Sequence, residues 1–159
     1  MSTYKRLVAL LLAAALAACS TQYQEMGFTG GVTAEPVMTD VYRITARGNA
    51  YTGSSQVQDF ALMKAAETTI AAGGTHFIIL DETDQTNLST AQTPGTMQTS
   101  VYGSTAFTTY TPGMTYNIVK PGQAVMIQVI RLSADQTPPP GAFPAMDIVQ
   151  TIGPRLKAS

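Results

Sequence analysis

Apolar and polar side chains alternate along residues 40–49, DVYRITARGN. Every second residue of a strand lies on the same face, so Tyr42, Ile44 and Ala46 share one side. The other side carries mostly polar residues, namely Val41, Arg43, Thr45, Arg47 and Asn49. This pattern predicts a half-buried strand with one face toward a core and one face toward water.

Residues 56–74, QVQDFALMKAAETTIAAGG, have the spacing of an amphipathic helix instead. The apolar positions that recur are Leu62, Ala66 and Ile70, with Phe60 and Met63 beside them. Ser55 and Gln58 stand three residues apart, which is the spacing of a capping box at a helix start. The pair Gly73 and Gly74 is typical of a helix end.

A continuous apolar run follows in residues 75–83, THFIILDET, and predicts a buried strand. Strand, helix and strand in succession indicate a βαβ unit. We expect its crossover to be right-handed and its two strands to be parallel.

Residues 84–112 are rich in Thr, Ser, Gly and Gln, and large aliphatic residues are few there. Two interpretations of this segment remain open. It forms short strands around residues 100–110 with a turn at Gly103 and Ser104, or it is disordered.

The segment that follows is typical of a hairpin, with strands at residues 114–119 and 124–132 around a turn at residues 120–123. The second of these strands is apolar on both faces, which favours a central position in the sheet. Residues 134–144 are rich in proline, and the last residues predict one short helix. Its apolar stripe is Met146, Val149 and Ile152, and Gly153-Pro154 is expected to end it.

Together these elements predict an α+β fold. It consists of a βαβ unit, a β-hairpin, a long Thr/Ser-rich loop and a short C-terminal helix, with a mixed sheet of about four strands packed on one helix. We expect a small domain at residues 40–133 with an irregular insertion at 84–112, and a Pro-rich connector with a helix at 134–159.

The first residues, MSTYKRLVALLLAAALAAC, have a basic start, a short apolar run and a small-residue end. This is the pattern of a secretory signal peptide. Leu16, Ala17, Ala18 and Cys19 resemble the lipobox of bacterial lipoproteins, which implies cleavage between Ala18 and Cys19 and lipid, including palmitate, on Cys19. Ser20 after the cysteine implies, from the same resemblance, transfer to the outer membrane rather than retention in the inner one.

The organisation that follows is a signal peptide at residues 1–18 and a flexible tether at 19–39. The chain has 9 basic and 10 acidic residues, and removal of Lys5 and Arg6 leaves seven basic residues and a formal charge of −3. Cys19 is the one cysteine, so its lipidation would leave no free thiol for catalysis or disulfide formation.

Several stretches resemble a family of small, mainly alphaproteobacterial, envelope lipoproteins of uncharacterised function. They are the strand motif Arg47-Gly48-Asn49, the helix motif Ala65-Ala66-Glu67, the strand Phe77-Ile78-Ile79 and the segment Met146–Pro154. The resemblance implies a location in the envelope and a fold, but it carries no activity.

Little in the sequence predicts an enzyme. His76 is the one histidine and falls on a predicted strand, so it has no second imidazole or free thiol to form a dyad. Asp81, Glu82 and Asp84 lack the loop spacing of a calcium site. Glycine-rich phosphate loops and a nucleophile elbow are missing from the sequence. We therefore expect no cofactor and no metal beyond the lipid on Cys19, and the near-neutral charge argues against nucleic acid.

Two groups of residues could serve binding. Arg43, Arg47 and Asn49, with Arg131 if its orientation matches, would form a small basic sheet face for an anionic partner. Tyr102, Phe107, Tyr110 and Tyr116 would form a recognition surface or simply pair across strands, and we favour pairing.

The leading hypothesis is a non-enzymatic lipoprotein, anchored in the outer membrane on its periplasmic side, that binds or scaffolds another envelope protein or polymer. The alternative is a structural subunit of a larger envelope assembly, such as a secretion, pilus or flagellar machine. A cell-wall or lipid-acting enzyme is a third and weaker hypothesis.

Overall fold

The computed structural model describes residues 20–157 and confirms the predicted α+β class. The chain divides into two compact units. The sheet unit contains the described residues up to Asn87 and again from Lys120, whereas the ribbon unit is Leu88–Val119. The predicted signal peptide and the lipidation residues Ala18 and Cys19 lie outside the described residues.

The sheet unit is built on five strands in the order β1-β2-β8-β3-β9. Their bounds are Gly31–Met38 for β1, Val41–Arg47 for β2, Gly122–Ile130 for β8, His76–Asp84 for β3 and Phe143–Pro144 for β9. Neighbouring strands are antiparallel at every pairing in this sheet. The central position predicted for the strand that became β8 is confirmed.

The predicted βαβ unit is present with one difference. β2 and β3 both pair antiparallel with β8, so they run in the same direction, but β8 lies between them. The sheet is therefore antiparallel throughout rather than mixed. Three of the four predicted strands lie in this sheet, and the fourth, Thr115–Lys120, lies outside it. The other two strands are β1, predicted as part of the tether, and β9, predicted as part of the Pro-rich connector.

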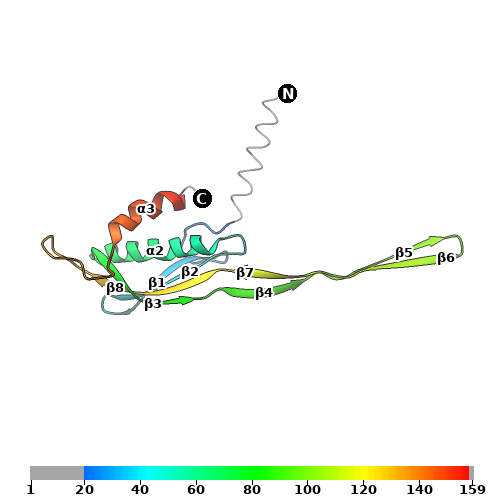
Figure 1. The fold of residues 1–159 in the computed structure, drawn as a ribbon, viewed down its shortest axis with the longest axis horizontal. Coiled ribbons are helices and arrows are strands. Elements are labelled where there is room, and N and C mark those ends of the chain that lie inside the picture. Colours follow the sequence, from blue (N-terminus) through cyan, green and yellow to red (C-terminus); the bar gives the residue numbers. More distant parts are fainter. Residues whose placement is uncertain (1–19, 158–159) are drawn as a thin grey trace, which may run out of the picture. The chain divides into compact units, whose positions relative to one another are not determined.

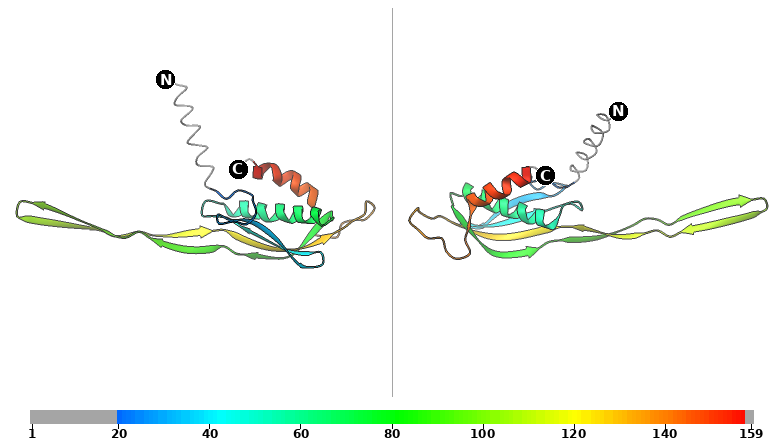
Figure 2. Two further views of the ribbon diagram at one scale, coloured as in Figure 1. Left: turned by 180° about the vertical axis from the view of Figure 1, so that it is seen from behind. Right: turned by 45° about the horizontal axis from the view of Figure 1, so that its top comes forward.

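Two helices cover one face of this sheet in successive layers (Figure 1). α2, Ser54–Ala71, packs across β1, β2, β8 and β3, and α3, Ala145–Lys157, packs on α2. Both further views show the same order of sheet, α2 and α3 (Figure 2). The core lies mainly between α2 and the sheet, where Ile44, Phe60, Phe77 and Ile127 are fully buried.

α2 ends as the sequence predicts but begins differently. Gly53 is its N-cap and makes no side-chain cap, so the capping box expected at Ser55 and Gln58 is not formed. At the other end, Gly73 has a φ of 74° and its amide donates to the Ile70 carbonyl at 2.9 Å. The Gly74 amide donates to the Thr69 carbonyl at 2.8 Å, which completes a Schellman motif.

The apolar stripe expected on α2 describes only part of its buried surface. Within that stripe, Ile70 is exposed and Leu62 is half-buried. Ala61, Ala65 and Thr69 lie outside the predicted stripe and are buried. α2 is the middle layer and contacts the sheet on one side and α3 on another, so it is buried around more of its circumference than a single stripe allows.

α3 does not end at Gly153-Pro154 as predicted, but continues to Lys157 with Pro154 inside it. Proline removes one helical hydrogen bond, which normally disfavours such a position. Here Leu156 is buried beyond the proline, and Gly153 is buried close to Met63 of α2. Packing against α2 therefore stabilises the last turn.

The flexible tether expected at residues 19–39 is wrong for the described part of that segment. Thr21 is 2% exposed, and its amide donates to Oγ1 of Thr52 at 2.9 Å. Its hydroxyl donates to the Thr29 carbonyl at 2.6 Å and accepts the Asn49 amide at 2.9 Å. β1 then pairs with β2 along its whole length. Thr21, two residues after Cys19, is therefore already part of the folded sheet unit.

The ribbon unit replaces the irregular insertion expected at residues 84–112. β4, Asn87–Gln92, pairs with β7, Thr115–Lys120, and β5, Thr96–Tyr102, pairs with β6, Thr105–Thr111. Of the two interpretations left open, the strands with a turn at Gly103 are the ones observed. The turn expected at residues 120–123 is absent, because β8 begins at Gly122 directly after β7 and pairs with β2 and β3 instead.

Candidate interaction surface

The ribbon unit is distinguished first by its composition. None of its 32 residues, Leu88–Val119, is charged, and nine of them are threonine. Natural proteins place charged side chains, especially lysine, on exposed strand edges to prevent pairing with other chains. The ribbon unit lacks that protection along its whole length.

Large apolar side chains are exposed throughout this unit. Every residue of β5 and β6 is exposed. Of the 17 exposed large hydrophobic residues in the described chain, nine lie in the ribbon unit: Leu88, Met97, Val101, Tyr102, Phe107, Tyr110, Met114, Tyr116 and Val119. Exposed large apolar side chains in such a concentration are typical of an interaction site.

The register of β5 and β6 divides these side chains between two faces. One face carries the pairs Met97–Tyr110, Thr99–Thr108 and Val101–Ala106, and the other carries Gln98–Thr109, Ser100–Phe107 and Tyr102–Thr105. Oγ1 of Thr99 lies 3.0 Å from Oγ1 of Thr108. Tyr102, Phe107 and Tyr110 thus lie on paired strands, as the sequence favoured, and of the three only Tyr102 stands opposite a β-branched residue, Thr105.

A two-residue turn fixes that register. Gly103 has a φ of 62° whereas Ser104 is not among the residues with positive φ, which matches a type II′ turn with glycine first. Side-chain hydrogen bonds that involve threonine also join β4 to β7: Gln92 Nε2 donates to Thr115 Oγ1 at 3.0 Å, and Thr90 Oγ1 donates to Asn117 Oδ1 at 3.3 Å. The register is therefore well defined although no third strand is present in either two-stranded sheet.

A two-stranded ribbon with both faces exposed is only marginally stable in water, and further strands or a packed face normally complete it. Each strand of β5 and β6 also has one edge without a neighbouring strand in the described chain. The ribbon unit is therefore an incomplete sheet, and it has both the apolar area and the backbone groups to bind another chain.

The basic face predicted from the sequence is only partly formed. Arg43 and Arg47 are exposed on the face of β2 turned away from the buried residues Ile44 and Ala46, as expected. Arg43 is paired in register with Glu35 on β1, and its guanidinium lies 4.0 Å from that carboxylate. Because the opposite charge stands beside it, this face is of mixed charge rather than basic.

Arg131 and Asn49 do not join that face. Arg131 follows β8, where its guanidinium forms an ion pair with Asp40 at 2.8 Å and donates to the Ala72 carbonyl at 2.8 Å. This contact holds the pKa of Asp40 below its ordinary value. Asn49 lies in the turn before α2, where its Oδ1 accepts the Tyr51 amide at 2.9 Å. Both residues stabilise loops in this structure.

The remaining candidate residues show no catalytic arrangement. His76 begins β3, as predicted, and its Nδ1 lies 3.0 Å from Oγ1 of Thr75. Asp81, Glu82 and Asp84 are exposed along the second half of β3. Among residues 20–157, no three histidine, cysteine or acidic side chains are placed together to hold a metal ion.

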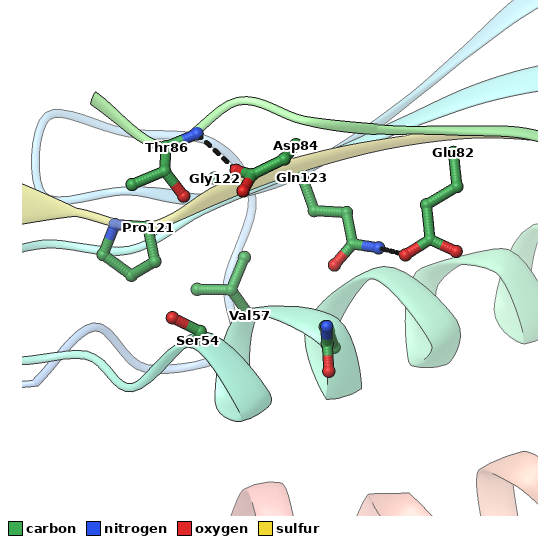
Figure 3. A pocket seen from close by; sticks show the side chains of 9 residues that line it. Ser54, Val57, Glu82, Asp84, Thr86, Pro121, Gly122 and Gln123 are labelled. Carbon is green, nitrogen blue, oxygen red and sulfur yellow. Dashed lines mark hydrogen bonds between the residues drawn. The ribbon is translucent and has the colours of Figure 1, made fainter. Parts of the chain in front are cut away.

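A hollow of about 250 Å³ lies beside the start of α2 (Figure 3). Its lining is largely polar and comes from α2, the end of β3 and the start of β8: Ser54, Val57, Gln58, Glu82, Asp84, Thr86, Pro121, Gly122 and Gln123. The Glu82 carboxylate accepts a hydrogen bond from Nε2 of the Gln123 side chain. Asp84 accepts hydrogen bonds from Thr86, which lower the pKa of that carboxyl. Both carboxylates thus accept hydrogen bonds from neighbouring residues.

A second hollow of about 330 Å³ lies between α2, α3 and the N-terminal segment, lined by Gln22, Tyr23, Met63, Glu67, Gly153, Leu156 and Lys157. The Tyr23 hydroxyl donates to Oε2 of Glu67 at 2.5 Å. Burial and this contact raise the pKa of Tyr23 above its ordinary range. The tyrosine is therefore a neutral donor that fastens the N-terminal segment to α2.

From the sequence, four aromatic residues of the ribbon unit were either a recognition surface or cross-strand pairs, with pairing favoured: Tyr102, Phe107, Tyr110 and Tyr116. The whole of residues 88–119 was not identified as one surface. The signal that could have found it is the absence of charge from residues 88–119 combined with regularly spaced aromatic and aliphatic residues. Comparison of the chain with family models, with curated proteins and with solved structures found no match.

Proposed function

We propose that this chain is a lipid-anchored protein of the bacterial envelope that acts by binding another envelope component, and that the ribbon unit is its binding surface. The observation that carries the second part is the concentration of exposed apolar side chains on an uncharged, incomplete sheet. Residues such as Phe107 and Tyr110 supply the kind of area on which protein interfaces depend.

The first part of the proposal rests on the sequence before the folded region. A basic start, an apolar run and the lipobox-like Leu16–Cys19 support export and lipidation of Cys19. Each buried methylene of an acyl chain contributes about 0.8 kcal/mol, so several chains give stable attachment. Ser20 supports an outer-membrane location on the periplasmic side, by the same resemblance. Among residues 20–157, no helix is both long and apolar enough to cross a bilayer.

The ordered start of the chain adds a consequence to lipid attachment. Thr21 is buried, so Ser20 is the one residue between Cys19 and the folded sheet unit. Two residues span roughly 7 Å when extended. Lipid on Cys19 would therefore hold the sheet unit close against the bilayer surface, with little freedom to reorient.

Membrane fractionation with palmitate labelling tests the anchor. Cys19→Ala is expected to abolish labelling and to leave an uncleaved precursor of higher mass, whereas Ser20→Ala, the matched control, is expected to retain label and processing. Unchanged labelling and mass in the Cys19→Ala variant would contradict the proposal.

A second candidate function is a structural subunit of a larger envelope assembly, and the ribbon unit favours it too. Exposed two-stranded ribbons with few charges are well suited to joining sheets between chains. Extraction in mild detergent followed by crosslinking separates the two: a stoichiometric complex of many subunits supports the assembly, whereas substoichiometric adducts support the binding protein.

A further inference from the structure

We propose that two copies of this chain pair through the free edge of β6, so that their ribbon units form one four-stranded antiparallel sheet with a two-fold axis at Thr108. This inference rests on the proposed function only in taking the ribbon unit as the binding surface, and it names the partner as a second copy. It does not depend on lipid attachment.

The turn determines which backbone groups of β6 point outward. In a hairpin with a two-residue turn, the flanking pair Tyr102–Thr105 is hydrogen-bonded, and hydrogen-bonded pairs then alternate along the strands. Ala106, Thr108 and Tyr110 belong to the other pairs, so their amides and carbonyls face away from β5. These three residues present a regular row of donors and acceptors to another strand.

The sequence of β6 complements itself when a second copy runs antiparallel across that edge. TAFTTYT, centred on Thr108, places Thr108 opposite Thr108, Ala106 opposite Tyr110 and Phe107 opposite Thr109. Phe107 thus lies against the β-branched Thr109, which is a favourable cross-strand pair, and Thr108 lies against Thr108. Tyr110 lies against Ala106, which is small enough to leave room for its ring. Pairing of Ala106, Thr108 and Tyr110 would form about six hydrogen bonds between the chains.

Charge also favours a second copy over a charged partner. Residues 88–119 carry no charge, so two ribbon units meet without repulsion and without a buried unpaired ion. A strand bearing lysine or glutamate would find no opposite charge on the ribbon unit to match it. β6 of a second copy is itself uncharged and has side-chain sizes that fit this register.

Oxidative crosslinking of the full chain in cells tests the register. In the proposed pair the two Thr108 Cα atoms lie about 5.5 Å apart, within the range of roughly 4.4–6.8 Å that disulfides require. Thr99 is the matched control because it is exposed, is also threonine, and lies directly opposite Thr108 on β5. Two Thr99 residues would be separated by three strand spacings, about 14 Å.

We expect Thr108→Cys to form disulfide-linked dimers on mild oxidation, whereas Thr99→Cys and the wild-type chain should form no covalent dimer. Dimers from Thr99→Cys alone would place the contact on β5 and overturn the proposal. Equal dimers from both variants, or none from Thr108→Cys, would also overturn it. Disulfide-linked dimers of the wild-type chain would instead reveal a free Cys19 thiol and contradict the proposed lipidation.

A second pair of variants guards against a misfolded cysteine variant. Thr108→Lys places two lysines directly opposite each other at the two-fold axis, whereas Thr99→Lys adds the same charge away from it. Sedimentation of the full chain in detergent should show the dimer dissociation constant raised at least about fivefold by Thr108→Lys and by less than about twofold by Thr99→Lys. A wild-type chain that stays monomeric up to high micromolar concentration would refute the pairing.

Discussion

Tyr23, two residues after the buried Thr21, donates its hydroxyl hydrogen to Glu67 of α2 across 2.5 Å, and its ring lies 5.7 Å from the ring of Phe60. Lys64, one turn from Phe60, forms a further ion pair with Glu25. These contacts join the chain just after Cys19 to the middle layer of the sheet unit. The N-terminal segment is therefore part of the fold and not a spacer.

The hydrogen bond from Tyr23 predicts a specific dependence of stability on pH. Burial and Glu67 raise the pKa of Tyr23 in the folded state above its unfolded value near 10. Its contribution is therefore complete below pH 10 and is lost as pH rises above that value. Because the side chain is partly exposed, the slope should be well below the limit of about 1.4 kcal/mol per pH unit.

Tyr23→Phe should lower the free energy of unfolding by about 0.5–1.5 kcal/mol at pH 8, and this difference should shrink above pH 10. Urea unfolding between pH 8 and 11 measures both effects. Tyr51→Phe, at an exposed tyrosine, is the control and should follow the wild-type curve. Parallel curves for wild type and Tyr23→Phe across the whole range would refute this role of Tyr23.

Replacement of Thr21 tests whether the segment just after Cys19 is held in the folded sheet unit. Thr21→Val keeps the shape of the side chain but removes the donor to the Thr29 carbonyl and the acceptor for the Asn49 amide. Because the site is buried, we expect a loss of about 1–3 kcal/mol in unfolding free energy. Thr29→Val, at an exposed position, should change it by less than about 0.5 kcal/mol. Equal effects of the two changes would indicate a loosely held segment.

The turn of the ribbon unit can be altered at two adjacent positions. Gly103→Val forces a β-branched residue into a positive φ, at a cost of about 1–2 kcal/mol. Amide hydrogen exchange in β5 and β6 should accelerate about 5- to 30-fold. Ser104→Val introduces the same side chain at a position without positive φ and should change exchange less than about twofold. Unaltered exchange in Gly103→Val would contradict the assigned turn.

The residue after the proposed lipidation site, Ser20, should determine in which of the two membranes the protein is found. Ser20→Asp introduces the residue associated with retention in lipoproteins of this kind, so the protein is expected to move from the outer to the inner membrane fraction. Density-gradient separation of the two membranes measures the shift, with Ser20→Ala as the control that stays in place. An unchanged distribution of the Ser20→Asp variant would contradict the proposed sorting.

Local pattern predicted much of the sheet unit. The alternation around Ile44 and the end of α2 just before Gly73 are determined by neighbours in sequence, and the structure has both. The position of β8 between β2 and β3 could not be predicted, because it depends on long-range pairing that periodicity does not contain. The continuation of α3 past Pro154 was not predicted, because proline normally ends a helix. Burial of Leu156 offsets the lost hydrogen bond, and this packing depends on contacts outside the helix.

β1 was missed, and the strands of the ribbon unit were left undecided, for a related reason. GVTAEPVM of β1 contains glycine and proline, which indicate a loop, and its order comes from pairing with β2. The threonine-rich residues 88–119 lack buried aliphatic positions, so composition alone could not separate strands from disorder. In both segments, backbone pairing and threonine hydroxyls replace the apolar periodicity on which sequence reasoning depends.

Site-specific photo-crosslinking in living cells tests the central claim, that the ribbon unit is the surface by which this protein binds. Tyr110 on β6 and Tyr51 in the sheet unit are both exposed, so each can be replaced by benzoylphenylalanine as a matched pair. We predict a discrete crosslinked adduct from position 110 and none from position 51. Absence of an adduct at position 110, or equal adducts at both positions, would contradict it.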